Sequence, residues 1–399
     1  MGLTVSQYGD LGPHEELYYT IEKLKKLAKT RTLDLDDTNY EKTLIECLCG
    51  RDVEGDKENY IPIYVENTNG RMLFSVCPKC NPLGQCCRCS GKGHILRTNQ
   101  MGFEELIPCN GCIQTRMMTD QLNRATIPTR YLTSHLSSPV HESFSFLGFD
   151  APTLENFENA REEVSNFCTL ASSCLRSKSQ RLYSKLYSTR KPILMDKPFL
   201  VLMGGVGTGK TYLASAALKH LITSSFTGVL IEDEQKPLDL YSVSGRFVDF
   251  PSLLLQIKDS FTQKSSELSV LTPLMETDVL VIDEFGKGRA DNSWQLEKLD
   301  DLINARYNNN RITILTTNYL PSAQDYLKKN DHSVPPSPSQ FEDFWSTDLS
   351  QRIGTRMFDR LLECSHFVSF VGLPSIRRKH AQRVQVSKPN QNESAFNKH

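Results

Sequence analysis

The sequence of 399 residues lacks any apolar run as long as 18 residues, the length that a membrane-spanning helix needs. Its first residues also lack the basic and then apolar pattern of a secretory signal peptide. Gly2 and Ser6 fit the loose myristoylation pattern, but no polybasic segment follows them. We therefore expect a cytoplasmic protein that has no membrane partner.

The chain has no excess of either charge, with 46 Lys and Arg against 47 Asp and Glu. The balance conceals a basic end, because beyond Ser375 the only acid is Glu393. The basic residues there are Arg377, Arg378, Lys379, Arg383, Lys388 and Lys398. Since Asn, Gln and Ser are also frequent, we expect either a solvated disordered tail or a tail that touches phosphates.

The composition excludes a disordered or fibrous chain, because 39% of the residues are hydrophobic and 23% are charged. The length exceeds one typical domain of about 100 to 200 residues. Nine of the twelve cysteines lie between Cys47 and Cys112, whereas strand and helix patterns alternate from there to about Gly372. We expect a helical segment at 1–45, a cysteine-rich domain at 46–118, an α/β domain with a parallel sheet at 119–374 and a basic disordered tail at 375–399.

A glycine-rich loop, GGVGTGKT, follows the apolar run 199–203 and precedes a helix-favouring stretch. The loop consists of Gly204, Gly205, Val206, Gly207, Thr208, Gly209, Lys210 and Thr211. In a strand–loop–helix context this spacing is typical of a phosphate-binding loop, because glycines let backbone N–H groups turn inward. We expect Lys210 to reach the β and γ phosphates of ATP and Thr211 to hold Mg²⁺. A glycine-rich turn without a ligand is the alternative that the full spacing disfavours.

Two further apolar runs end in polar side chains that would complete such a site. The run 279–282 ends in Asp283 and Glu284. We expect Asp283 to hold Mg²⁺ through water and Glu284 to orient and deprotonate the attacking water. The run 311–317 ends at Asn318, which either bonds the γ-phosphate or the catalytic water, or caps a turn.

Eight cysteines form four close pairs with metal-ligand spacing. They are Cys86 and Cys89, Cys109 and Cys112, Cys47 and Cys49, and Cys77 and Cys80. The first two pairs can meet as one tetrahedral Zn²⁺ site, and the other two could form a second site. Disulfides are the rival, which a cytosolic location disfavours. Spacing alone leaves the pairing and the number of zinc ions open.

The order GGVGTGKT, VLVIDEFG and ILTTN resembles the AAA+ ATPases, and more narrowly the family of the DnaC and DnaI helicase loaders and the IstB transposition helper. ATIPTRYL at 125–132 and RFVDFPSLLLQIKDSF at 246–261 are similar to other segments of that family. The resemblance extends over about 124–379, and it implies an AAA+ P-loop fold that hydrolyses ATP. The stretch CCRCSGKG resembles the zinc region of DnaJ.

The segment RIGTRMFDRLLE at 352–363 resembles the family segment that carries the arginine finger. The resemblance implies that Arg360 completes the ATP site of a neighbouring subunit in a homo-oligomer, with Arg356 as the alternative. The alternative to an arginine finger is a surface arginine that forms ordinary ion pairs. Arg377 or Arg378 matches a further nucleotide-sensing arginine only weakly.

The resemblance also implies partners. We expect an assembly that binds single-stranded DNA and loads a replicative helicase, with the zinc region docking a protein partner. A transposition helper that acts with a transposase and an ATP-binding assembly switch with little turnover are the alternatives. The segments 228–245 and 328–343 make the chain longer than a minimal loader, and the sequence does not reveal their roles.

Overall fold

The computed structural model describes residues 63–68, 71–76, 94–98, 101–108, 113–136, 149–183, 194–225, 242–262, 268–287, 293–319, 348–370 and 372–379. These residues fall into two compact units. The first takes its described residues from Met1–Thr133, Ser172–Leu194 and Leu218–Arg246, and the second from Ser134–Ala171, Met195–Ala217 and Phe247–His399. The predicted helix in segment 1–45, all eight predicted zinc ligands and segment 328–343 lie outside the described residues.

The first unit contains two antiparallel hairpins. β1 (Ile63–Thr68) pairs with β2 (Arg71–Val76), and β3 (His94–Thr98) pairs with β4 (Glu104–Pro108). Helix α3 (Ile113–Arg124) follows the second hairpin, and the short η3 (Thr129–Tyr131) comes after it. The side-chain amide of Asn123 fixes α3 to β2, since its Oδ1 accepts the Phe74 N–H at 2.8 Å and its Nδ2 donates to the Phe74 carbonyl at 3.0 Å.

A five-stranded sheet with the order β6-β7-β8-β5-β9 holds the second unit together. Its strands are β5 (Phe199–Gly204), β6 (Gly245–Asp249), β7 (Val279–Asp283), β8 (Ile312–Thr317) and β9 (Ser365–Phe370). β5 runs parallel to β8 and β9, and β7 runs parallel to β8. The central strands are almost wholly buried, because helices cover both faces of a parallel sheet.

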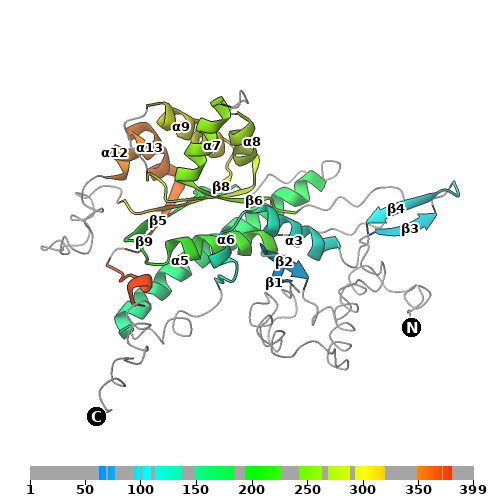
Figure 1. The fold of residues 1–399 in the computed structure, drawn as a ribbon, viewed down its shortest axis with the longest axis horizontal. Coiled ribbons are helices and arrows are strands. Elements are labelled where there is room, and N and C mark those ends of the chain that lie inside the picture. The colour runs from blue at the N-terminus through cyan, green and yellow to red at the C-terminus, as the bar shows by residue number, and fades with distance from the viewer. Residues whose placement is uncertain are drawn as a thin grey trace, which may run out of the picture. The chain divides into compact units, whose positions relative to one another are not determined.

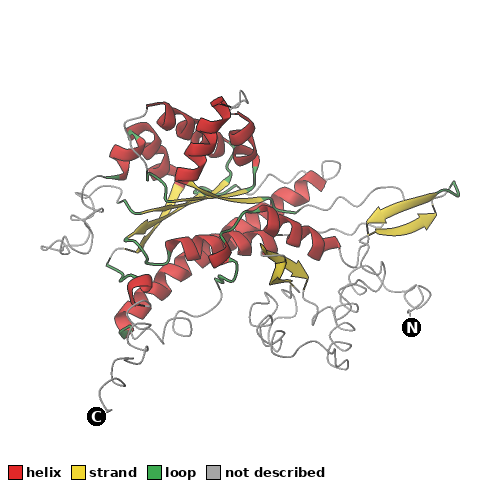
Figure 2. Cartoon of the chain, in the orientation of Figure 1, coloured by secondary structure: helices red, strands yellow, loops and turns green. Residues whose placement is uncertain are grey.

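One group of the described helices covers one face of this sheet (Figures 1 and 2). They are α7 (Phe250–Thr262), α8 (Leu268–Glu276), α9 (Ser293–Asn308), α12 (Leu349–Ile353) and α13 (Thr355–Cys364). The first parts of α5 (Ala151–Tyr183) and α6 (Lys210–Ser224) cover the other face. None of the described helices is long and apolar enough to span a membrane.

Helix α5 packs on the sheet through an apolar stripe at helical spacing. The stripe consists of the buried side chains Leu154, Phe157, Ala160, Val164, Phe167 and Ala171. At its inner end Phe167 meets the ring of His366 on β9 edge to face, with 6.0 Å between the ring centroids. The polar side of α5, which includes Glu155, Glu162 and Glu163, faces water.

A fully buried arginine ties α9 to its neighbours. Arg306 donates to the carbonyls of Leu274 at 2.6 Å and Thr277 at 2.8 Å, at the end of α8. It also donates to the Ile312 carbonyl at 2.5 Å and the Thr313 hydroxyl at 2.8 Å, at the start of β8. A buried charge is tolerated when its donors are satisfied in this way.

The predicted α/β class is confirmed in the second unit, which is a parallel sheet flanked by helices with the glycine-rich loop between β5 and α6. The apolar runs 199–203, 279–282 and 311–317 form β5, β7 and β8. The segment 246–261, which is similar to a family segment, forms the end of β6 and most of α7.

Candidate nucleotide site

The glycine-rich loop leaves β5 and enters α6, which begins at Lys210. Gly207 and Gly209 have φ angles of +80° and +100°, in the region that side chains with a Cβ rarely adopt. The Thr208 hydroxyl donates to the Gly205 carbonyl at 2.9 Å and braces the turn. The loop therefore has the strand–loop–helix context that the phosphate-binding prediction requires, with the positive end of a helix dipole at its exit.

The ammonium of Lys210 lies within the loop. The residue is only 6% exposed, and its Nζ donates to the carbonyls of Gly204 at 2.8 Å and Gly205 at 2.6 Å. Burial lowers the pKa of Lys210 to about 8, although the nearby carboxylates of Asp283 and Glu284 oppose this shift. A buried cation of this kind gains strongly from an anion that enters the loop.

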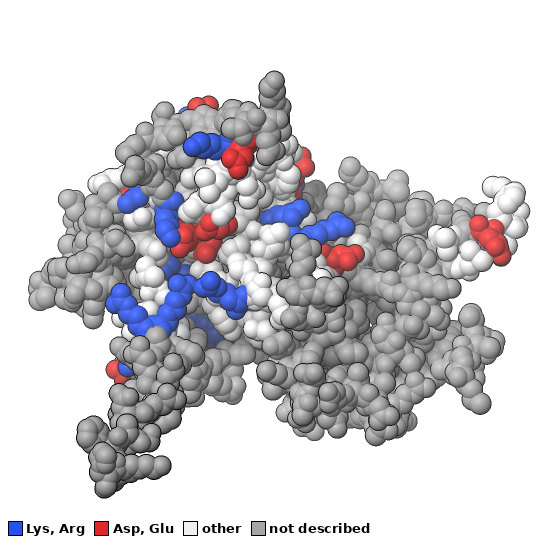
Figure 3. All heavy atoms as spheres, in the orientation of Figure 1, with Lys and Arg blue, Asp and Glu red and all other residues white. Residues whose placement is uncertain are grey.

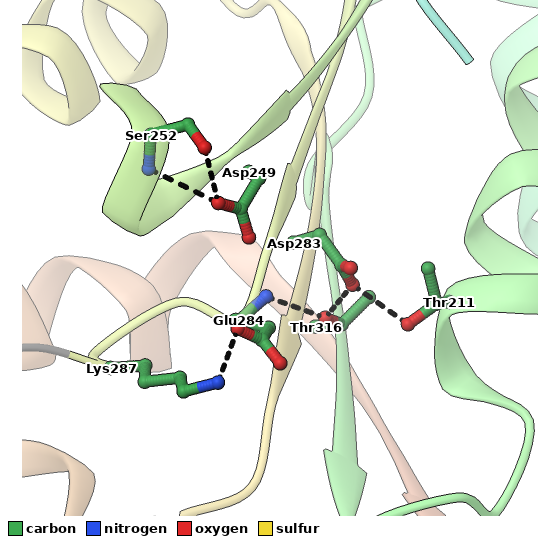
Figure 4. A network of polar contacts seen from close by, with 7 residues as sticks. All are labelled: Thr211, Asp249, Ser252, Asp283, Glu284, Lys287 and Thr316. Atoms are coloured by element: carbon green, nitrogen blue, oxygen red, sulfur yellow. Dashed lines mark hydrogen bonds and ion pairs between the residues drawn. The ribbon is translucent and has the colours of Figure 1, made fainter. Parts of the chain in front are cut away.

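The first acid of β7 meets two hydroxyl groups (Figure 4). Asp283 Oδ1 accepts from Thr211 Oγ1 at 2.9 Å and from Thr316 Oγ1 at 2.5 Å. Burial raises the pKa of Asp283, and Glu284 and Asp249 raise it further, whereas the two hydroxyl hydrogen bonds lower it. The hydroxyl and the carboxylate that we expect to hold Mg²⁺ thus lie side by side, and oxygen ligands of this kind suit that ion.

The second acid, Glu284, begins the turn after β7 with a φ of +57°, which is uncommon for a residue other than glycine. Its N–H donates to Thr316 Oγ1 at 3.0 Å. Its carboxylate accepts from Lys287 Nζ at 2.6 Å. A strained backbone held by several contacts is typical of a functional position.

A third carboxylate, that of Asp249, ends β6 at the same edge and was not part of the sequence prediction. Its Oδ2 accepts from the N–H of Ser252 at 3.1 Å and from its hydroxyl at 2.7 Å, which caps α7. The other oxygen is turned toward the loop that carries Glu284 (Figure 4). The strand-ending acid in RFVDF could have indicated this residue, since VLVIDE has the same pattern.

The predicted sensor Asn318 lies at this edge too. Met203 of β5 pairs with Thr317 of β8, so Asn318 stands one residue beyond the end of that register. The guanidinium of Arg352 on α12 lies over the ring of the next residue, Tyr319, 4.4 Å from its centroid. The structure therefore brings together the loop, Asp283, Glu284 and Asn318 at the carboxyl edge of the sheet.

The residues after β9 pack against the loop from outside. The N–H of Ile376 donates to the Gly207 carbonyl at 2.9 Å. A Cβ placed on Gly207 would lie 2.3 Å from the hydroxyl of Ser375, and one on Gly209 would lie 3.3 Å from Ile376 Cδ1. Close approach to Ser375 and backbone conformation thus both favour glycine at Gly207, whereas at Gly209 the positive φ is the main constraint. Sequence reasoning missed this contact, which involves the first residues of the predicted tail.

Comparison with known proteins gives only distant likenesses. No protein-family model matches the chain, and no curated protein matches it. A crystal structure of the DnaC helicase loader is similar with a TM-score of 0.35 and 20% identity, over 61% of this chain and 99% of that one. A DnaI structure has a TM-score of 0.28 and 19% identity, over 48% of this chain and 82% of that one. A structure of the replication initiator DnaA, bound to AMPPCP and single-stranded DNA, has a TM-score of 0.33 and 12% identity, over 65% of this chain and 56% of that one.

The two arginine-finger candidates differ in their surroundings. Arg360 is largely buried, and its NH1 donates to Asp300 Oδ1 on α9 at 2.6 Å. The side chain of Arg356 is 77% exposed, and its Nε lies 3.9 Å from Asp300 Oδ2. Both stand on α13, one helical turn apart. In the single chain, therefore, Arg360 is engaged by α9 while Arg356 faces solvent.

Charges of both signs lie on one face of the second unit. On the face shown in Figure 3, acidic side chains gather in the middle of this unit and basic side chains border them. Among the described residues on this face there is thus no uniformly basic surface.

Proposed function

We propose that this chain is a P-loop ATPase of the AAA+ type that binds ATP with Mg²⁺ and hydrolyses it. One observation carries the proposal: Thr211, at the start of α6, donates to Asp283, at the end of β7, at 2.9 Å. A phosphate-binding loop and a strand-ending acid from distant parts of the chain thus converge on one point. The buried ammonium of Lys210 lies within the same loop.

Each residue then has a role. Backbone N–H groups of the loop and Lys210 bind the phosphates, and Thr211 and Asp283 hold Mg²⁺, which neutralises the charge that develops on the phosphate oxygens. Glu284 orients the attacking water and accepts its proton, while Asn318 bonds the γ-phosphate or that water. Arg360 of a neighbouring subunit completes the site.

Two substitutions test the ATPase proposal. Lys210→Ala should abolish ATP binding because it removes the charge that meets the phosphates. Glu284→Gln should keep binding and stop turnover, because it removes only the base. Binding of a fluorescent ATP analogue and release of phosphate measure the two steps separately, and Glu297→Gln, at an exposed acid of α9, serves as the control. Wild-type turnover in the Glu284 variant would overturn the assignment.

We further propose that the ATPase assembles on single-stranded DNA and loads a replicative helicase. The order of the motifs supports this role, as does the name of the DnaC helicase loader among the similar structures. Co-purification with the cell's replicative helicase is the expected result, and co-purification with a transposase would favour a transposition helper instead. The ion pair on Glu284 favours slow turnover, as in an ATP-binding switch.

The cysteine region is proposed to hold zinc and to dock the protein partner. Cys109 follows β4 directly, and Pro108 at the end of β4 pairs with His94 at the start of β3. The chain before β3 and the chain after β4 therefore start from neighbouring positions. This register supports one Zn²⁺ shared by Cys86, Cys89, Cys109 and Cys112, with Cys47, Cys49, Cys77 and Cys80 as a second set.

A further inference from the structure

The loop after β7 contains a contact that the proposed chemistry does not use. Lys287 Nζ donates to Glu284 Oε2 at 2.6 Å, and the Lys287 N–H donates to the Glu284 carbonyl at 2.9 Å. Between them Gly286 has a φ of +82°, which allows the chain to turn back on itself. The carboxylate that is proposed to act as the base is therefore held by a cation three residues further on (Figure 4).

This contact restricts what Glu284 can do. The oxygen that accepts from the ammonium is occupied, so only the other oxygen of the Glu284 carboxylate is left to accept a proton from water. General-base catalysis requires the carboxylate within hydrogen-bond reach of the proton that it takes. In this arrangement the lysine competes with the attacking water for Glu284.

The surroundings of the ammonium are acidic. The pKa of Lys287 is raised chiefly by its hydrogen bond to Glu284, and the charge of Asp249 raises it further. Glu284 is the carboxylate that the ammonium contacts (Figure 4).

We propose that Lys287 is a positioning residue that holds Glu284 in the turn and thereby lowers the rate at which Glu284 can act as the base. The inference rests on the proposed ATPase function. The side chains of Lys287 and Glu284 are 55% and 35% exposed, and such ion pairs are weak. The restraint is accordingly partial, and its removal should raise the rate only modestly.

The test measures ATP hydrolysis and ATP binding by the full chain. Lys287→Ala should raise kcat of the isolated protein about two- to fivefold, equivalent to about 0.4 to 1 kcal/mol, with KM for ATP unchanged. Lys287→Arg should restore the low rate, because an arginine can make the same ion pair. Lys298→Ala is the matched control, since it removes a lysine that pairs with acids on α9.

The rescue by arginine decides between a restraint and a merely structural role. A Lys287→Ala rate at or below wild type would overturn the proposal, as would a Lys287→Arg rate as high as that of Lys287→Ala. Failure of the ATPase function itself is recognised separately, because Glu284→Gln would then still hydrolyse ATP or the wild type would not bind it.

Discussion

The hydroxyl of Thr316 lies 2.5 Å from Asp283 Oδ1, to which it donates, and it accepts the N–H of Glu284 at 3.0 Å. One residue of the central strand β8 thus fixes both acids at the end of β7. Since β8 also lies beside β5, this hydroxyl sets the metal-binding acid and the base relative to the phosphate-binding loop.

Thr316→Val should therefore impair turnover more than binding. The substitution keeps the β-branched shape but leaves the N–H of Glu284 unpaired, which we expect to cost about 1 to 3 kcal/mol of stability. We expect a fall in kcat of about tenfold with little change in ATP affinity. Urea unfolding and phosphate release measure the two effects. Thr316→Ser retains the hydroxyl and should remain close to wild type, and equal rates in the Val and Ser variants would contradict this role.

ATP affinity should fall at alkaline pH because Lys210 has a pKa of about 8 in the nucleotide-free site. Bound phosphate favours the charged lysine and so raises its pKa. Below about pH 8 the lysine is charged before and after binding, and affinity should be independent of pH in that range. Above it, binding must take up a proton, and affinity should fall by up to about tenfold per pH unit.

Titration calorimetry at about pH 7 and pH 9, in buffers of different ionisation enthalpy, measures both the affinity and the proton uptake predicted for Lys210. Lys210→Arg, which stays charged, serves as the comparison and should lose the pH dependence. Constant affinity of the wild type over this interval would show that the ammonium is not the group that meets the phosphates.

Arg306→Met should destabilise the second unit by about 3 to 5 kcal/mol, because it leaves several buried carbonyls without a donor. Chemical unfolding followed by circular dichroism measures the change. Arg356→Met, at an exposed position of α13, is the control and should stay within about 0.5 kcal/mol of wild type. Similar losses in the two variants would show that the buried network contributes little.

Arg360 is predicted to act in trans. Arg360→Ala should leave ATP binding by the isolated subunit intact and reduce DNA-stimulated hydrolysis by about 10³-fold or more. Loss of its ion pair with Asp300 accounts for only about 0 to 1 kcal/mol. Mixing this variant with Lys210→Ala should restore some activity, because a mixed interface can join an intact loop to an intact finger.

Two results would change or refute the arginine-finger assignment. If Arg356→Ala abolishes hydrolysis while Arg360→Ala does not, the finger lies one helical turn earlier, on the side chain that is exposed in the single chain. If neither change matters and activity per chain is independent of protein concentration, the subunit acts alone.

Metal analysis of the purified chain should find about one to two zinc ions, since thiolate sites of this kind supply about 10 to 16 kcal/mol of apparent binding energy. Cys86→Ser should lose zinc and unfold the region before Arg124. Cys87→Ser is the matched control, because its position is not needed by either set of ligands. Native disulfides, or a folded region that contains no metal, would exclude the zinc prediction.

The sequence was sufficient to predict the sheet edge because its signals are local. The runs that form β5, β7 and β8 are continuous and apolar, and each leads into residues that could bind a nucleotide or its metal ion. Parallel strands place their carboxyl ends together, so the glycine-rich loop, Asp283 and Asn318 could be assigned to one edge before any strand order was known.

The remaining contacts depend on geometry that no local pattern encodes. The Lys287 to Glu284 contact requires a left-handed residue inside the turn, and the position of Asp249 at the same edge requires β6 to lie next to β7. Arg306 stands in the polar stretch INARYNNN, where nothing in the sequence pattern indicates that this arginine is buried. The packing of Ser375 on the loop joins two segments far apart in the chain.

The strand order also determines when the nucleotide site can form during folding. β5, which carries the phosphate-binding loop, takes one of its two neighbours from β9, so Phe199 pairs with Ser365 only after most of the chain has been synthesised. Pairings between such distant segments form slowly, and until then β5 has an unpaired apolar edge that can associate with other chains. A nascent or truncated chain that ends before β9 would accordingly carry every motif of the nucleotide site and still be prone to aggregate.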